Sequence, residues 1–176
     1  MMWRTHIILG VTVPIIIGDF GGAVVGAIGS IAPDWMEQIP RLFGGRKVAH
    51  RTTTHILVYW IGVVLVGLSV THLSTMPLWF AVGGLSHVVA DMFTPMGVPI
   101  FPTQKHRTNI LGGAVRTGSI AEYVVMGACL LTITLALRGG GVRDNGYLPF
   151  FPDYYHKYDT GVIDAYELKQ NRLRFF

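Results

Sequence analysis

Three long apolar stretches dominate the pattern of hydrophobic and polar positions along the chain. They cover residues 56–70, 77–92 and 120–137. The first holds no charged residue or histidine, and the other two hold only three between them. A helix needs about 20 apolar residues to cross the hydrocarbon core of a bilayer. Each stretch approaches this length, so the pattern predicts three membrane-spanning helices.

The N-terminal region is also apolar but is divided in two. Residues 7–17 and 20–32 are separated by a short glycine-rich segment, GDFGG, and each half is too short to span a bilayer alone. The region forms either one long kinked helix or a hairpin of two half-helices. The whole pattern therefore predicts an all-α, polytopic membrane helical bundle with three spanning helices and this N-terminal hairpin or kinked helix.

The composition supports a membrane protein and excludes several other classes. Only 24 of the 176 residues are charged, which is 14% against about 25% in soluble domains, and the mean hydropathy is +0.46. The single cysteine, Cys129, excludes a disulfide scaffold, and the apolar content excludes disorder. No basic run is present, so we expect no nucleic-acid partner.

The few charges are unevenly distributed. Residues 1–138 hold 14 charged side chains, whereas the much shorter segment 139–176 holds 10. We therefore expect a membrane-embedded helical domain over residues 1–138, followed by a polar and aromatic C-terminal tail over residues 139–176.

Basic residues gather in two of the loops between the predicted helices. The loops at 33–54 and 102–118 contain Arg41, Arg46, Lys47, Arg51, Lys105, Arg107 and Arg116. The loop at 72–76 contains no lysine or arginine. Cytoplasmic loops of membrane proteins carry the excess of basic residues. The pattern thus predicts a multi-pass protein of the inner (cytoplasmic) membrane with the two basic loops in the cytoplasm.

Ionisable residues inside apolar helices are costly, and they indicate function by default. His87 and Asp91 are four residues apart in the second stretch and therefore share one helix face. An imidazole and a carboxylate at this spacing can ligate one metal ion. The alternative is a hydrogen-bonded pair that only packs helices together.

A second cluster precedes the first spanning stretch. His50, Arg51 and His55 lie in the sequence HRTTTH. On one continuous helix the two histidines would diverge by about 140°. We therefore place His50 in the loop, with a threonine capping the helix that carries His55, so that both imidazoles can face one point. The alternative is a pair of histidines near the lipid headgroups.

The chain topology brings these polar residues to one membrane face. Asp34, which alone would suggest a turn or helix cap, and the HRTTTH cluster come before the first crossing. His87 and Asp91 end the return crossing, and Glu122 begins the next one. We predict that all of them lie at the cytoplasmic face. His6 joins them only if the N-terminal region is a hairpin.

Such a cluster of histidines and acids, without a useful cysteine, suits a hydrolytic metal centre. Zinc is the first choice of divalent metal, followed by manganese or iron. We predict that Arg51 acts at the catalytic centre and that Lys105 and Arg107 bind an anionic group of the substrate. The alternative function for these bases is anchoring to lipid headgroups.

The order of motifs resembles the YdjM family. The motifs, in chain order, are APDWME, AHRTTTH, GGLSHVVADMFTPMGVPIFP, KHRTNI and GSIAE, and the resemblance covers roughly residues 1–135. Members are small inner-membrane proteins described as metal-dependent hydrolases and related to zinc-dependent phospholipases C and single-strand nucleases. The resemblance implies that the metal ligands are Asp34, His50, His55, His87 and Asp91, with His6 matching an N-terminal motif and Glu122 as a further ligand or catalytic base.

One position departs from the family pattern. The family often has a second acid two positions after the aspartate of the PD motif, and here that position is Met36, followed by Glu37. A site that needs this acid either binds one metal fewer or uses Glu37 instead.

The expected partners follow from these predictions. They are membrane lipids, a phosphoester or lipid-linked substrate, and a protein that contacts the aromatic C-terminal tail. Two other functions stay open: a non-enzymatic membrane protein that assembles a complex or binds a regulator around a structural metal, and an ion or metal transporter. The transporter ranks last because the sequence indicates a single polar layer rather than a polar path across the bilayer.

Overall fold

The computed structural model describes residues 1–17, 19–45, 50–71, 74–104, 106–138 and 160–161. Within these ranges the regular structure is helical, apart from one isolated bridge between Val98 and Thr108. The elements are α1 (Trp3–Ile16), α2 (Phe20–Met36), α3 (Ile39–Leu42), η1 (Thr53–His55), α4 (Leu57–Ser69), α5 (Met76–Met92), η2 (Leu111–Gly113) and α6 (Ile120–Arg138). The predicted all-α class is confirmed.

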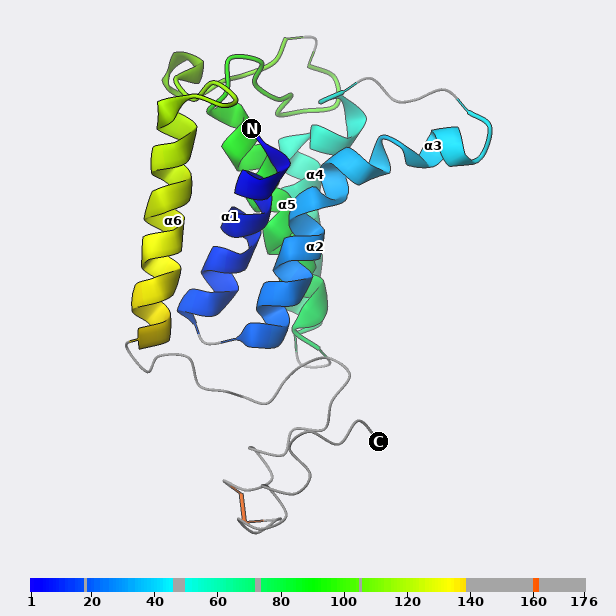
Figure 1. The fold of residues 1–176 in the computed structure, drawn as a ribbon. Coiled ribbons are helices and arrows are strands. Elements are labelled where there is room, and N and C mark those ends of the chain that lie inside the picture. The colour runs from blue at the N-terminus through cyan, green and yellow to red at the C-terminus, as the bar shows by residue number, and fades with distance from the viewer. Residues whose placement is uncertain (18, 46–49, 72–73, 105, 139–159, 162–176) are drawn as a thin grey trace.

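The N-terminal region forms a helical hairpin, which is one of the two arrangements that the sequence leaves open. Helices α1 and α2 run in opposite directions side by side (Figure 1). Asp19 caps α2 by accepting a hydrogen bond from the backbone N–H of Gly22 at 2.6 Å, and its other oxygen accepts one from Trp79 Nε1 at 2.6 Å. The hairpin brings the start of α1 and the end of α2 to the same end of the bundle.

Small residues let the central helices approach closely. Gly22, Gly26 and Ser30 recur every four residues along α2 and are buried. A Cβ atom at Gly26 would collide with the backbone carbonyl of Gly10 in α1, and one at Gly83 in α5 would collide with the carbonyl of Gly26. Such spacing of small residues is typical of tightly packed membrane helices. Helix α2 is therefore held between α1 and α5.

The predicted apolar stretches correspond to α4, α5 and α6, but three spans are not confirmed. Among the described helices, only α6 is both long and apolar enough to cross a membrane by length and composition. Helix α4 has 13 residues and α5 has 17, which is about 20 and 26 Å of helix against about 30 Å of hydrocarbon. Helix α4 is short because the chain before it forms the turn η1 and an extended residue, Ile56.

A long connection between α5 and α6 covers one end of the bundle (Figure 1). Two backbone hydrogen bonds attach it to the end of α5: Ile110 N–H donates to the Met92 carbonyl at 2.7 Å, and Val115 N–H donates to the Phe93 carbonyl at 3.0 Å. The largest buried apolar cluster lies in the same half and comprises Ala32, Trp60, Val88, Met92 and Val98. This packed end supports the polar residues described next.

Candidate metal centre

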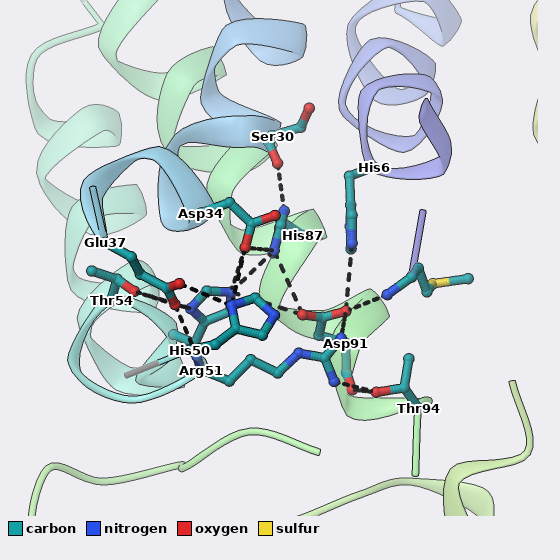
Figure 2. Close-up of polar contacts among 12 residues, drawn as sticks. His6, Ser30, Asp34, Glu37, His50, Arg51, Thr54, His87, Asp91 and Thr94 are labelled. Carbon is teal, nitrogen blue, oxygen red and sulfur yellow. Dashed lines mark hydrogen bonds and ion pairs between the residues drawn. The ribbon is translucent and has the colours of Figure 1, made fainter. Parts of the chain in front are cut away.

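The polar residues of four separate segments meet at the covered end of the bundle (Figure 2). The residues are His6 of α1, Asp34 of α2 with Glu37 just after it, His50 and Arg51 of the segment before α4, and His87 and Asp91 of α5. His55 of η1 belongs to the same cluster. The side chains form two groups, and within each group the ligand atoms all lie within 4.8 Å of one another. One group is Asp34, Glu37, His50 and His55, and the other is His6, His87 and Asp91.

Four ligand atoms also converge between the two groups. His55 Nε2 lies 3.1 Å from His87 Nε2 and 3.4 Å from Asp34 Oδ1. Asp91 Oδ2 is 3.6 Å from His87 Nε2 and 3.8 Å from His55 Nε2, and Asp34 Oδ1 is 3.7 Å from His87 Nε2. Ligands about 2.0–2.2 Å from a tetrahedral zinc lie roughly 3.3–3.6 Å from one another. The five separations, from 3.1 to 3.8 Å, bracket this range, so the four atoms are spaced close to a metal-binding set.

The hydrogen bonds of the two histidines direct their free nitrogens to this point. The Nδ1 atom of His87 lies 2.6 Å from the carbonyl oxygen of Ser30, and that of His55 lies 3.1 Å from Glu37 Oε1. The Ser30 carbonyl can only accept, so His87 Nδ1 carries the proton and the neutral His87 ring has a bare Nε2. His55 Nδ1 also lies 3.0 Å from the Thr54 hydroxyl, which can donate or accept, so either nitrogen of His55 can hold its proton. The two Nε2 atoms are 3.1 Å apart, a separation that suits either a hydrogen bond between the rings or a shared cation. Metal-ligating histidines are oriented by such partners.

The electrostatics of His55 favour the neutral ring that a metal requires. Its side chain is fully buried. Burial lowers the pKa of His55, and the neighbouring Asp34 carboxylate only partly opposes this shift. Desolvation disfavours a charged imidazole. The ring is therefore available as a ligand near neutral pH.

The two aspartates each contribute one oxygen that fits a metal. Asp91 Oδ1 is already engaged: it accepts a hydrogen bond from Arg51 Nη2 at 2.7 Å, contacts the Met1 ammonium at 2.9 Å and lies 3.4 Å from His6 Nε2. This leaves Oδ2 facing the histidines. Asp34 Oδ1 is buried without a hydrogen-bond partner among the described residues, an arrangement that costs free energy unless a cation satisfies it. The donor set thus fits a divalent metal.

The other two histidines of the ligand groups, His50 and His6, lie on either side of this set. His50 Nδ1 lies 2.9 Å from Glu37 Oε2 and 3.7 Å from Asp34 Oδ1, and the ring is half-exposed. The His6 ring stacks on that of His87, with centroids 3.7 Å apart. Residues from both histidine motifs, from the PD motif and from α1 therefore share one site, and Glu37 occupies a place beside Asp34.

A match to a family model covers residues 1–143, and the family is described as YdjM inner membrane protein. The chain belongs to this family. Comparisons with curated proteins and with solved structures found no match. The matched region contains every residue of the two ligand groups described above and ends shortly after α6.

The other residues predicted for the site have different surroundings. Arg51 is buried and donates to Thr94 Oγ1 at 2.6 Å as well as to Asp91. Arg107 donates to the backbone carbonyl of His50 at 2.9 Å. Lys105 and the C-terminal tail lie outside the described residues, except Thr160 and Gly161. The metal, catalytic and substrate-binding roles themselves stay predictions.

Glu122 lies apart from both ligand groups. Its fully buried carboxylate accepts hydrogen bonds from the backbone N–H of Met2, from Thr5 Oγ1 at 2.9 Å and from the N–H of Gly118 at 2.7 Å. These contacts join the start of α1 to the start of α6. The geometry gives Glu122 a part in holding the two helices together, and no sequence pattern indicates those partners.

Two further groups contact the ligating histidines: the Ser30 carbonyl, which emerges only from the structure, and Glu37, which the sequence indicates as a substitute acid. The Ser30 carbonyl orients His87, and no side-chain motif reports a carbonyl. Glu37 accepts from the backbone N–H of Arg51 at 2.8 Å and contacts both His50 and His55. Its position three residues after Asp34, on the same side of a helix, is the signal that indicates it.

Proposed function

We propose that this YdjM protein is an integral-membrane, metal-dependent hydrolase. The observation that carries the proposal is the convergence of the Nε2 atoms of His55 and His87, 3.1 Å apart, with one oxygen each of Asp34 and Asp91. A divalent metal held there, with zinc as the first choice, would supply an activated water near neutral pH and polarise an ester or phosphoryl oxygen.

The chain's own residues would position the reaction. Glu37 and the Ser30 carbonyl lie against the Nδ1 atoms of the two ligating rings and would hold their orientation. Arg51 neutralises the Asp91 oxygen that faces away from His55 and His87. Asp34 is partly exposed, with 39% of its side chain accessible, so the cluster can be reached from the surface.

Exposed side chains support a position within the bilayer. Large apolar residues face outward along α4 and α6, among them Leu65, Val66, Val124, Leu131 and Leu135. Monomeric soluble proteins rarely expose contiguous apolar faces of this extent. The shorter helices are packed against one another, and α1 packs against α6 (Figure 1), so we propose that the whole bundle, rather than α6 alone, is embedded in lipid.

The site end has the features of a cytoplasmic interface. Trp3, Trp35 and Phe43 are strongly exposed there, and aromatic side chains gather at headgroup level. Arg107 and Arg116 lie in the connection that covers this end, and basic loops favour the cytoplasmic side. We propose that the metal centre opens toward the cytoplasmic face of the inner membrane.

The test is hydrolysis by the purified full chain in detergent. We expect turnover of chromogenic phosphomonoesters, phosphodiesters or carboxyl esters that is abolished by a chelator and restored by zinc, manganese or iron. His55→Ala should lose this activity. His106→Ala, at an exposed histidine outside both ligand groups, should retain it. Metal-independent turnover, or equal activity of the two variants, would contradict the proposal.

A structural metal in a non-enzymatic protein is the second candidate. Asp34, His55, His87 and Asp91 can supply four protein ligands, and a closed set of four is typical of structural zinc. The same samples distinguish the two functions. Stoichiometric metal that depends on His55, with no turnover of any ester class, favours the structural site.

A further inference from the structure

An open cleft of about 490 Å³ lies beside the ligand groups. Its lining residues are Arg51, Thr94, Pro95, Met96, Arg116 and Thr117. Arg51 and Thr94 connect the cleft to the ligand groups, because Arg51 donates both to Thr94 Oγ1 and to Asp91 Oδ1. A molecule in this cleft would therefore lie next to the carboxylate that faces His55 and His87.

One wall of the cleft holds a buried cation with an unpaired donor. The Arg51 side chain is only 7% exposed. Its two terminal nitrogens are paired with Thr94 and Asp91, but Nε is buried and has no hydrogen-bond partner among the described residues. A buried unpaired donor costs free energy. An acceptor from a bound molecule would remove that cost.

The lining also contains a second cation, Arg116. This side chain is exposed, and its guanidinium takes part in no hydrogen bond or ion pair within the described part of the chain. Gly113, three residues earlier, has φ +70° and lies directly against Pro95, which also lines the cleft. The lining includes no acidic residue, and because Arg51 is already paired with Asp91, Arg116 supplies the unpaired positive charge of the cleft.

The chemistry of the lining indicates a phosphate ester. Two guanidinium groups and the Thr117 hydroxyl offer more donors than one carboxylate can accept, whereas a phosphoryl group has three acceptor oxygens. Pro95 and the half-exposed Met96 provide an apolar surface for the alkyl part of an ester. We propose that this cleft binds the phosphoryl group of a phosphate ester, with Arg116 as a substrate-binding residue.

This proposal deepens the proposed hydrolase and rests on it for the reaction, but binding can be measured without turnover. The full chain in detergent, with a chelator present, is titrated calorimetrically with inorganic phosphate and with dihexanoyl phosphatidic acid. We expect saturable binding of at least one probe. Tighter binding of the lipid identifies a headgroup as the source, and equal binding identifies a soluble phosphate.

The deciding variant is Arg116→Gln, at an exposed position where loss of folding is not expected. A charged hydrogen bond lost from a partly exposed site corresponds to about a tenfold weaker affinity. Arg138→Gln, at the exposed far end of α6, is the matched control and should bind as the unaltered chain does. Equal affinities of the two variants, or no saturable binding of either probe, would overturn the proposal.

Metal content of the same protein preparations, measured before the chelator is added, separates the two proposals. Loss of phosphate binding in Arg116→Gln at unchanged metal content supports the cleft independently of the hydrolase. A folded chain that binds phosphate through Arg116 but takes up no metal would contradict the hydrolase and leave the cleft supported.

Discussion

The hydrogen bonds that orient His55 and His87 determine what the cluster can bind. One partner is the main-chain carbonyl of Ser30 and the other is the side chain of Glu37. Only the second can be changed by substitution without altering the backbone. Glu37 is 1% exposed and contacts His50, His55 and the backbone N–H of Arg51, so its carboxylate is the main support of the HRTTTH segment.

Glu37→Gln is expected to weaken metal binding. An amide can donate to His55 Nδ1, which would move the ring proton to Nε2, the atom that faces the metal site. Loss of such an orienting partner typically costs about 10- to 100-fold in metal affinity. The measurement is competition with a chromophoric chelator in detergent.

Asp19→Asn is the matched control for that substitution. It also removes a carboxylate that accepts two hydrogen bonds, but at the turn between α1 and α2. We expect its metal affinity to be unchanged, whatever its stability. An equal loss of affinity in both variants would show that general destabilisation, rather than orientation of His55, is responsible.

Glu122→Ala is expected to lower stability and leave metal binding intact. The substitution leaves the donors of Met2, Thr5 and Gly118 without their acceptor, at a cost of about 1–3 kcal/mol. For a chain of this size that corresponds to a fall in Tm of roughly 2–4 °C for each kcal/mol. Thermal unfolding and metal content of the same sample test both parts. Loss of metal from folded protein would instead support Glu122 as a ligand.

At the residue scale, the sequence indicated the positions with unusual chemistry but not their partners. The i, i+4 spacing of His87 and Asp91 was sufficient to place them on one face. The departure at Met36 drew attention to Glu37, which contacts His50 and His55. Two of the three partners of Glu122, Met2 and Thr5, lie over 100 residues away in the sequence, and no local pattern reports such contacts.

Close crossings between helices hold the elements that carry the site. Gly26 faces the backbone of Gly10 on one side and Gly83 on the other. These contacts join α1, α2 and α5, the three helices that carry His6, Asp34 and Asp91. Small shifts at the crossings would therefore move ligand atoms relative to one another.

Gly83→Ala is expected to destabilise the bundle. The added Cβ meets the Gly26 carbonyl and the Ser30 backbone, and overpacking of this kind costs about 1–3 kcal/mol. Gly62→Ala is the control, since a Cβ there has nothing within 4 Å and alanine favours a helix by about 0.5–1 kcal/mol. Thermal unfolding in detergent should show a lower Tm for Gly83→Ala and no lower Tm for Gly62→Ala. Equal Tm values would contradict the close crossing.

At the element scale, apolar runs located α4, α5 and α6 to within a residue or two, because continuous apolar sequence is a strong helix signal. The sequence could not decide between a kinked helix and a hairpin at the N-terminus, since both bury the same residues. It overestimated the number of helices that reach spanning length. The segment before α4 instead forms the turn that presents His55.

The molecule as a whole has two unlike ends. One end combines the titratable cluster, the covering connection and exposed aromatic residues, and the other holds, within the described residues, the end of α1, the start of α2 and the end of α6 (Figure 1). Helix α6 connects the two, from Ile120 beside the site to Arg138 at the far end. This difference between the two ends is the basis of the proposed orientation in the membrane.

The orientation predicts opposite accessibility at the two ends. With Cys129→Ser as background, Thr103→Cys at the site end should react with a membrane-impermeant thiol reagent only in inside-out vesicles. Arg138→Cys should react in intact spheroplasts. Both positions are exposed in the structure. Labelling of both from the same side would contradict a spanning α6.

In the proposed metal centre, His55 and His87 share one metal with carboxylate oxygens. X-ray absorption of the purified, metal-loaded chain measures this coordination. We expect two imidazole nitrogens and oxygen ligands at about 2.0–2.2 Å from the metal, with the imidazole signal reduced in His87→Ala and unchanged in His106→Ala. A folded chain that takes up no metal, or a metal whose shell is the same in both variants, would contradict it.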